Sequence, residues 1–226
     1  SLFIAADTFD MEINFSNSGV QDSAIVIVGD SAGGTVFTSS TRNPLLMDRV
    51  SYVEILNIEF SGSAESGVKL VNRSGSIVFK NCSFIGNSAY SMGGGMHIDG
   101  STYAIGGRYC PVRYKTRLTG CIFAGNSADG GGGICSDWNE LELNNCTFSS
   151  NRASRGNALF FGPWDSFRPS IAELTGCIIG DVDENIYNND GSTITISYSD
   201  IPGGESTIYD PCGILVWGDG NIDADP

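Results

Sequence analysis

The chain has 226 residues, with 26 Asp and Glu against 12 Lys and Arg, and its formal net charge at pH 7 is −14. This charge argues against nucleic-acid binding, because the phosphates of a nucleic acid need a basic protein face. No apolar run approaches the roughly 18–20 residues of a membrane-spanning helix, so no transmembrane segment is expected. No signal peptide is visible at the start, so a secreted protein would already have lost it.

We expect one domain over residues 1–226, because this length can bury a substantial core without a second unit. Residues 1–54 contain short β-branched stretches without a recurring motif and predict early, irregular coils. Residues 55–190 carry a repeated motif, with an insertion near residues 99–117. Residues 191–226 predict a closing coil, and a fragment of a longer chain is an open alternative.

A motif of the form Cys-x-Phe-x-x-Asn-x-Ala recurs within the motif-bearing part. Its three copies centre on Cys82, Cys121 and Cys146, and a fainter copy contains Cys177. The spacings of 39, 25 and 31 residues fall in the range of repeat architectures. The motif therefore predicts stacked structural repeats, with insertions in the connections between them.

The segments after each motif decide between two kinds of repeat protein. The spacing of Leu143, Cys146, Phe148 and Asn151 also fits the leucine-rich-repeat template, which returns through a helix or a 3₁₀ turn. The segments that follow here contain Gly triplets and β-branched residues, which are poor helix formers and good strand formers. The sequence therefore predicts an all-β fold, a parallel β-helix of about seven to nine coils with almost no helix.

The Cys and Phe of each motif are two residues apart, so they lie on the same face of a strand. Stacked coils would place them in inward-facing columns, with the Asn at the bend that ends the strand. There we expect the Asn to adopt left-handed backbone angles and to hydrogen-bond the backbone of the next coil. The predicted ladder consists of Cys82, Phe84, Asn87, Cys121, Phe123, Asn126, Cys146, Phe148, Asn151 and Cys177.

The seven cysteines predict a mostly reduced chain. Stacked Cys side chains would have Cβ atoms about 4.8 Å apart, more than the roughly 3.8 Å that a disulfide prefers. Zinc is not expected, because no C-x-x-C pair exists and one column cannot supply a tetrahedron. A bridge between Cys110 and Cys135 is an open alternative if the insertion folds back, and the state of Cys212 is left open.

The insertion concentrates positive charge, since four of the twelve Lys and Arg residues lie within residues 108–117, shortly after the only His. Basic groups there would neutralise an acidic sugar and abstract its α-proton, and tyrosines would stack on sugar rings. The alternative is a solvated loop whose charges offset an acidic body. The candidate glycan-binding residues are His97, Arg108, Tyr109, Arg113, Tyr114, Lys115 and Arg117.

Two acidic stretches carry carboxylates and amides at alternate positions, as at the start of a calcium-binding EF-hand loop. Both lack the Gly required at the sixth position, where Ile186 and Ala224 stand, and Asp-rich turns are common without a metal. No cofactor is required, and Ca²⁺ is the candidate ion. Its candidate ligands are Asp181, Asp183, Asn185, Asp219, Asn221 and Asp223.

The pairing of Phe-x-x-Asn with Gly-Gly-Gly-Met and Gly-Gly-Gly-Ile resembles right-handed parallel β-helix proteins of the pectate-lyase-like superfamily. It is most similar to the repeats of bacterial polymorphic outer-membrane protein adhesins. The resemblance covers residues 55–190 well. It implies a right-handed parallel β-helix in a protein that is secreted or lies at the cell surface. The fold hosts lyases, hydrolases, adhesins and inert stalks, so it does not fix the function.

We therefore expect a non-catalytic extracellular or cell-surface module for structure, adhesion or glycan contact. Its expected partners are a polysaccharide or further copies of itself, joined end to end or laterally through open strand edges. The alternative is a polysaccharide lyase or hydrolase that acts on an acidic glycan. The paired Asp motifs of β-helix polygalacturonases and the Arg signature of pectate lyases are absent, and a flexible insertion is a poor platform for catalysis.

Overall fold

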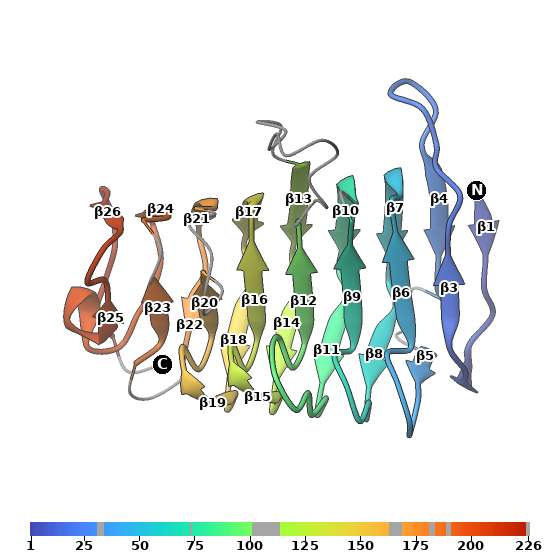
Figure 1. Cartoon of the computed structure of the whole chain (residues 1–226), viewed down its shortest axis with the longest axis horizontal. Helices are drawn as coiled ribbons and strands as arrows, with labels where there is room; N and C mark the ends of the chain where they lie inside the picture. Colours follow the sequence, from blue (N-terminus) through green and yellow to red (C-terminus); the bar gives the residue numbers. More distant parts are fainter. Residues whose placement is uncertain are drawn as a thin grey trace, which may run out of the picture.

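The computed structural model describes residues 1–30, 34–72, 74–100, 114–162, 169–180, 184–188 and 191–224. Within them the chain forms strands, and the only helical element is the 3₁₀ helix η2 (Gly204–Thr207). The strands wind into a parallel β-solenoid of about eight turns, with the two ends of the chain at opposite ends of the stack (Figure 1). The predicted all-β parallel β-helix with almost no helix is therefore confirmed.

Three parallel sheets form the sides of the solenoid. The nine-stranded sheet has the order β1 (Leu2–Phe3), β4 (Ile25–Val28), β7 (Ser51–Leu56), β10 (Gly75–Lys80), β13 (Tyr114–Thr119), β17 (Asn139–Asn144), β21 (Ile171–Thr175), β24 (Thr193–Ser197) and β26 (Ile214–Trp217). The seven-stranded sheet has the order β2 (Asp7–Asp10), β5 (Thr35–Thr38), β8 (Glu59–Ser61), β11 (Ser83–Ile85), β14 (Ile122–Ala124), β18 (Thr147–Ser149) and β22 (Ile178–Ile179). The eight-stranded sheet has the order β3 (Ile13–Phe15), β6 (Leu45–Asp48), β9 (Val68–Val71), β12 (Met96–Asp99), β16 (Ile134–Asp137), β20 (Leu159–Phe161), β23 (Ile186–Asn188) and β25 (Ile208–Tyr209). A separate short pair consists of β15 (Ser127–Gly130) and β19 (Arg152–Arg155).

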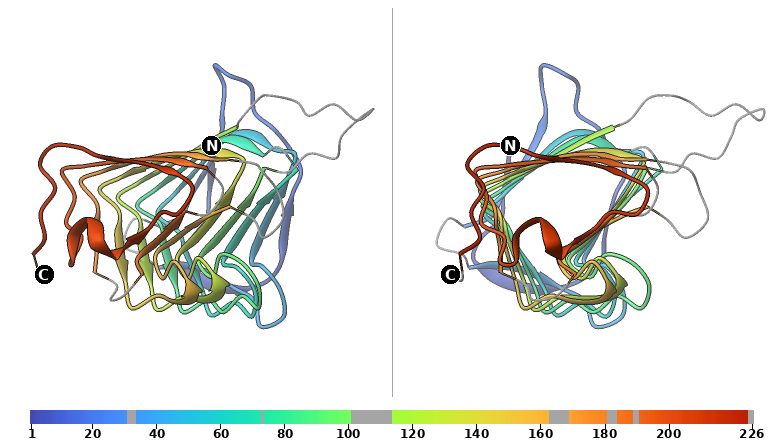
Figure 2. Two further views of the ribbon diagram at one scale, coloured as in Figure 1. Left: turned by 60° about the vertical axis from the view of Figure 1, so that its left-hand side comes forward. Right: turned by 90° about the vertical axis from the view of Figure 1, so that its left-hand side faces the viewer.

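Seen along the axis, the coils superpose and the sheets enclose one interior (Figure 2, right). Neighbouring strands pair in parallel register, so a given position of each coil faces the same direction. Side chains alternate along each strand, as in β10, where Ile77 and Phe79 are buried while Ser76 is exposed. The inward positions of the three sheets merge into one apolar core.

Phenylalanine rings form a stacked column in this core. The ring centroids of Phe60, Phe84, Phe123 and Phe148 follow one another at 5.4, 4.4 and 4.9 Å, with interplanar angles of 20°, 2° and 6°. All four side chains are fully buried, and Phe37 extends the column toward the N-terminus at 5.8 Å from Phe60. Offset stacking of this kind adds to the free energy gained by burying the rings.

A column of cysteines runs beside the phenylalanines. Cys82, Cys121, Cys146 and Cys177 are buried and not bonded to one another, and each Sγ lies 3.5–3.7 Å from two backbone carbonyl oxygens. The hydrogen bond to Cys121, together with burial, raises the pKa of the Cys146 thiol to about 12. The thiolate is the reactive form of cysteine, so a protonated, buried Cys146 is inert at neutral pH.

The remaining cysteines lie off this column. Cys135 on β16 is buried, whereas Cys212 is exposed and forms no disulfide. Cys110 lies outside the described residues, so the alternative bridge from Cys110 to Cys135 stays open.

The asparagines form a hydrogen-bonded ladder at the bend after the seven-stranded sheet. Asn126 Oδ1 accepts hydrogen bonds from the backbone N–H and from Nδ2 of Asn87, at 3.1 and 3.0 Å. Asn151 Oδ1 accepts the equivalent pair from Asn126, at 3.0 and 2.9 Å. Each Nδ2 also donates to a backbone carbonyl one coil earlier, so the ladder saturates the polar groups of a buried bend.

The left-handed angles predicted for these asparagines fall instead on the residue before each of them. Gly86, Gly125 and Ser150 have φ of 62°, 63° and 57°, whereas none of the three ladder asparagines has a positive φ. The sharp change of direction occurs one residue early because the Asn side chain must point inward to reach the neighbouring coil.

Replacing Phe123 or Phe148 with Ala should lower the free energy of unfolding by about 3–5 kcal/mol, because each change leaves a cavity within the column. The control is Ile122→Ala, since Ile122 adjoins Phe123 but points outward and is 44% exposed, so its loss should stay below about 1 kcal/mol. Denaturant titration measures both. A loss below about 1 kcal/mol in the Phe variants would contradict their place in the core.

A thiol reagent should label Cys212 in the folded protein and the four column cysteines only after denaturation, because burial shields the column from the reagent. Mass spectrometry after labelling in each state counts the modified residues. Detection of three disulfides, or fast labelling of Cys121 in the folded protein, would show that the column is not a buried set of thiols.

Candidate functional site

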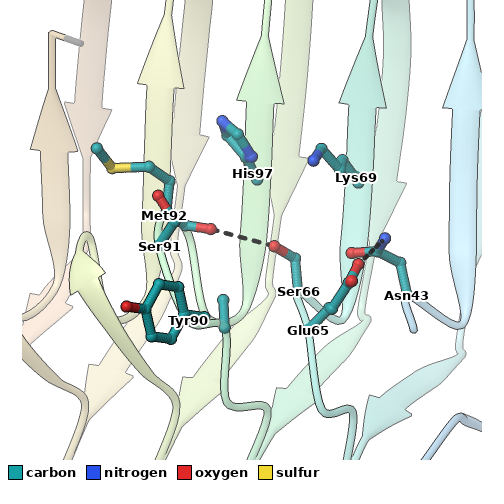
Figure 3. A pocket seen from close by; sticks show the side chains of 9 residues that line it. Asn43, Glu65, Ser66, Lys69, Tyr90, Ser91, Met92 and His97 are labelled. Carbon is teal, nitrogen blue, oxygen red and sulfur yellow. Dashed lines mark hydrogen bonds between the residues drawn. The ribbon is translucent and has the colours of Figure 1, made fainter. Parts of the chain in front are cut away.

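A polar pocket of about 220 Å³ lies on the outer face of the eight-stranded sheet (Figure 3). It is shaped by β9 and β12 and by the connections that precede them. Its lining residues are Asn43, Glu65, Ser66, Lys69, Ala89, Tyr90, Ser91, Met92 and His97.

The back of the pocket comes from two neighbouring strands. Lys69 on β9 pairs in register with His97 on β12. The preceding residues, Val68 and Met96, are buried in the core, so strand alternation turns Lys69 and His97 outward. Both side chains therefore project from the same face, side by side (Figure 3).

The rim is made by connections that are tied to one another. Asn43 Nδ2 donates a hydrogen bond to Glu65 Oε2 at 2.8 Å, and Ser66 Oγ donates to the backbone oxygen of Met92 at 3.2 Å (Figure 3). Successive coils thus hold the rim in place, which favours a preformed pocket over one that closes around its ligand.

The Gly triplet that marks the repeat permits this arrangement. A Cβ atom added at Gly94 would lie 2.5 Å from the backbone oxygen of Ser127, and one at Gly95 would lie 2.7 Å from the backbone oxygen of Gly133. Glycine therefore lets the coil run close against the next one. The residues that precede the triplet, 89–92, line the pocket.

His97 is a neutral imidazole at physiological pH. Burial and the neighbouring charge of Lys69 lower the pKa of His97 to about 4, although Asp99 opposes them. A neutral imidazole has one donor nitrogen and one acceptor nitrogen. His97 can therefore satisfy a ligand hydroxyl in either direction.

The other polar groups complement it. Lys69 supplies donors and Glu65 supplies acceptors, while Asn43 Oδ1 is buried and has no hydrogen-bond partner within the described part of the chain. Tyr90 stands at the rim with 97% of its surface exposed. Donors, acceptors and an exposed aromatic ring are thus gathered around one small concavity.

The structure separates the residues that the sequence grouped with His97. Arg108, Tyr109 and Arg113 lie outside the described residues. Lys115 and Arg117 are on strand β13 of the nine-stranded sheet, whereas His97 is on the eight-stranded sheet.

The described end of the basic segment is a strand with fixed contacts. Lys115 and Arg117 both form ion pairs with Glu142 on β17, the latter at 2.5 Å. Tyr114 has the opposite orientation and covers Gly75, where an added Cβ would collide with the tyrosine side chain. The three residues therefore do not form one aromatic and basic cluster.

The candidate calcium ligands are only partly covered by the described residues. Asp181 and Asp183 lie outside them, and Asn185 is buried. Asn221 Oδ1 accepts from the backbone N–H of Ser199 at 3.0 Å. Asp223 Oδ1 accepts from the backbone N–H of Gly203 at 2.6 Å, so both side chains stabilise bends.

No group of three or more His, Cys, Asp or Glu side chains in the described ranges is arranged to hold a metal ion. Asp219, the last candidate, accepts a hydrogen bond from Tyr198 through its backbone oxygen. With Asp181 and Asp183 outside the description, calcium binding stays a prediction.

Sequence reasoning missed Lys69, Tyr90 and Glu65. The signal for Lys69 becomes visible once coils are aligned, because Gly-Val-Lys-Leu (67–70) and Gly-Met-His-Ile (95–98) place Lys69 and His97 at the same position. Tyr90 and Glu65 belong to connections of unequal length. The repeat of the motif therefore does not predict which residues lie next to them.

A family model described as "Right handed beta helix region" matches residues 7–164. A search of curated proteins gave no match. Among the described residues, no helix is long and apolar enough to span a membrane.

The imidazole of His97 should titrate near pH 4 in the folded protein, against about 6.5 in an unfolded chain. His97 is the only His, so its NMR signals are unambiguous. Between these pH values the unfolded state binds a proton that the folded state does not, so stability is fully present above pH 6.5 and falls as the pH drops toward 4. Lys69→Met should raise the pKa of His97, because it removes a neighbouring positive charge. Titration near pH 6.5 in the folded wild-type protein would contradict the half-buried, neutral imidazole.

Proposed function

Since the chain belongs to the right-handed β-helix family, we propose a function that uses the outer face of this scaffold. The protein is a non-catalytic extracellular or cell-surface module that binds a neutral sugar unit of a glycan in the pocket beside His97. The observation that carries the proposal is the nearly fully exposed Tyr90 at the rim of a polar pocket on a rigid sheet.

The chemistry of the pocket suits a sugar ring. A ring has one apolar face that stacks on an aromatic side chain, and its edge carries hydroxyl groups that both donate and accept hydrogen bonds. Tyr90 offers the aromatic face, and Glu65, Lys69 and neutral His97 offer partners of both kinds. The volume is below the range of drug-sized sites, about 300–1,000 Å³, and suits a single sugar unit.

The same groups favour binding over turnover. An acid or base catalyst works best with a pKa near the working pH, whereas the pKa of His97 is about 4. Glu65 is the one carboxylate among the lining residues, and it already accepts a hydrogen bond from Asn43. A paired acid and base are therefore missing from the described lining.

The catalytic alternative has support of its own. Lys115 and Arg117 lie on a strand rather than in a loop, next to the carboxylate of Glu142. A lyase acting on an acidic glycan would use such cations to neutralise the substrate carboxylate. Lys115 and Arg117 lower the pKa of Glu142, which makes this carboxylate a poor general base, so we favour the binding module.

The proposal includes adhesion and a location outside the cell, which the acidic composition and the resemblance to surface adhesins support. Self-assembly through open strand edges, whose backbone groups can pair with another strand, is a further part of the proposal.

Tyr90→Ala should weaken binding of neutral sugars about tenfold, because stacking contributes roughly 0.5–1.5 kcal/mol beyond buried area. NMR titration with a panel of neutral mono- and oligosaccharides measures the dissociation constants. Lys69→Met should weaken binding as well. The matched control is Tyr198→Ala, since Tyr198 is 66% exposed but lies outside the pocket.

Equal affinity in the wild-type, Tyr90→Ala and Lys69→Met proteins would reject this pocket as the site. Cleavage of an acidic polysaccharide by the wild-type protein, abolished by Lys115→Ala, would replace the binding module with the lyase.

A further inference from the structure

A second concavity, of about 190 Å³, lies on the outer face of the nine-stranded sheet, away from the pocket beside His97. Its floor comes from β7, β10 and β13. One wall comes from the connection between β3 and β4, which projects beyond the coils (Figures 1 and 2). Its polar lining residues are Gln21, Tyr52, Glu54, Ser76, Lys115 and Arg117.

The projecting wall is fixed to the sheet. The backbone N–H of Gly19 donates to Ser51 O at 3.0 Å, and the backbone N–H of Ser51 donates to Ser18 Oγ at 3.0 Å. A Cβ atom added at Gly19 would lie 2.5 Å from the backbone oxygen of Tyr52, so this contact requires glycine. The two hydrogen bonds and the close approach of Gly19 therefore hold the wall against β7.

The opposite side of the concavity is basic. Lys115 and Arg117 have side chains that are 38% and 44% exposed, and both pair with Glu142, which is only 18% exposed. Burial opposes ionisation of Glu142, but the hydrogen bonds and charges of Lys115 and Arg117 outweigh it and lower its pKa. The carboxylate is therefore ionised and holds both cations in place.

Arg117 retains donors that this contact does not use. Of its guanidinium nitrogens, only Nε donates a hydrogen bond to a described residue, to Glu142 Oε2. The two terminal nitrogens remain for a ligand, and a guanidinium edge matches the two oxygens of a carboxylate. Glu54, the acidic residue of the lining, is paired with Lys80 at 3.1 Å, so its charge is offset.

We propose that this concavity is a second binding site, which takes a small carboxylate that also carries hydroxyl groups, such as a sugar acid. Arg117 and Lys115 bind the carboxylate. Gln21, Tyr52 and Ser76 bind the hydroxyl groups.

The overall charge restricts the ligand further. At −14, the chain repels extended polyanions, and only the local cations attract a negative group. A single carboxylate is therefore favoured over a highly charged polymer.

The test is NMR titration of the full chain with D-glucuronate, D-glucose and acetate. Glucuronate should bind about tenfold or more tightly than either other probe, because each of them supplies only half of the recognised groups. Arg117→Gln should weaken glucuronate binding at least about tenfold, and 0.5 M salt should weaken it too. Gln21→Ala, which leaves all the charges in place, should reduce the preference for glucuronate over acetate.

Arg49→Gln is the matched control, because Arg49 is an exposed, Asp-paired arginine outside the concavity, and it should leave glucuronate binding unchanged. Equal binding of glucuronate and glucose, or equal losses in Arg117→Gln and Arg49→Gln, would overturn the proposal. So would the absence of glucuronate binding at millimolar concentrations. If Arg117→Gln unfolds, Lys115→Gln provides the same comparison.

The outcome is separable from that of the pocket beside His97. Tyr90→Ala should leave glucuronate binding unchanged, and Arg117→Gln should leave neutral-sugar binding unchanged. Loss of glucuronate binding in Tyr90→Ala would place the acid in the first pocket and overturn the second site.

Discussion

In-register backbone pairing between successive coils is the constraint on which the rest of the structure depends. Each strand hydrogen-bonds to the strands of the coils before and after it, so equivalent positions stack at the spacing between strands, about 4.8 Å. A side chain that suits one coil must therefore suit its neighbours. The Phe84, Phe123 and Phe148 rings satisfy this condition by near-parallel stacking.

The same constraint explains polar groups inside the structure. A bend turns backbone groups toward the interior, where an unsatisfied donor or acceptor costs roughly 1–3 kcal/mol. Asn126 uses both ends of its amide, accepting from Asn87 and donating to Asn151 and to Phe84 O. The ladder also opposes a slip in register, because a shift by one residue would leave these amides unpaired.

The inward half of the fold could be predicted from the sequence because its pattern repeats. The Cys and the Phe of the motif are two residues apart in each of the three clear copies, as in Cys82 and Phe84. Strand alternation alone places such residues on one face. The left-handed backbone angle predicted for the Asn was wrong. At the bend, Gly86 adopts the left-handed angle and the next residue, Asn87, forms the hydrogen bonds.

The neighbours of outward-facing side chains were harder to predict from the sequence, because they come from other coils and depend on connections of unequal length. Lys69 and His97 are neighbours only after register is known, and Tyr90 enters from a connection without a fixed period. The sequence predicted a basic loop for Lys115 and Arg117. Their neighbours Thr116 and Leu118 are buried, and this alternation is that of a strand. The many charged residues in that segment obscured the alternation of inward and outward positions that is typical of a strand.

Both concavities form where a connection rises above a flat sheet. Gly94 and Gly95 let the coil that follows rim residues 89–92 lie close against the next coil, and Gly19 lets the 16–24 connection lie against β7. In each case the core fixes the floor, and the outward side chains remain free to vary in chemistry. Replacing an outward residue leaves the inward columns intact, so the ligand of such a solenoid can change at little cost in stability.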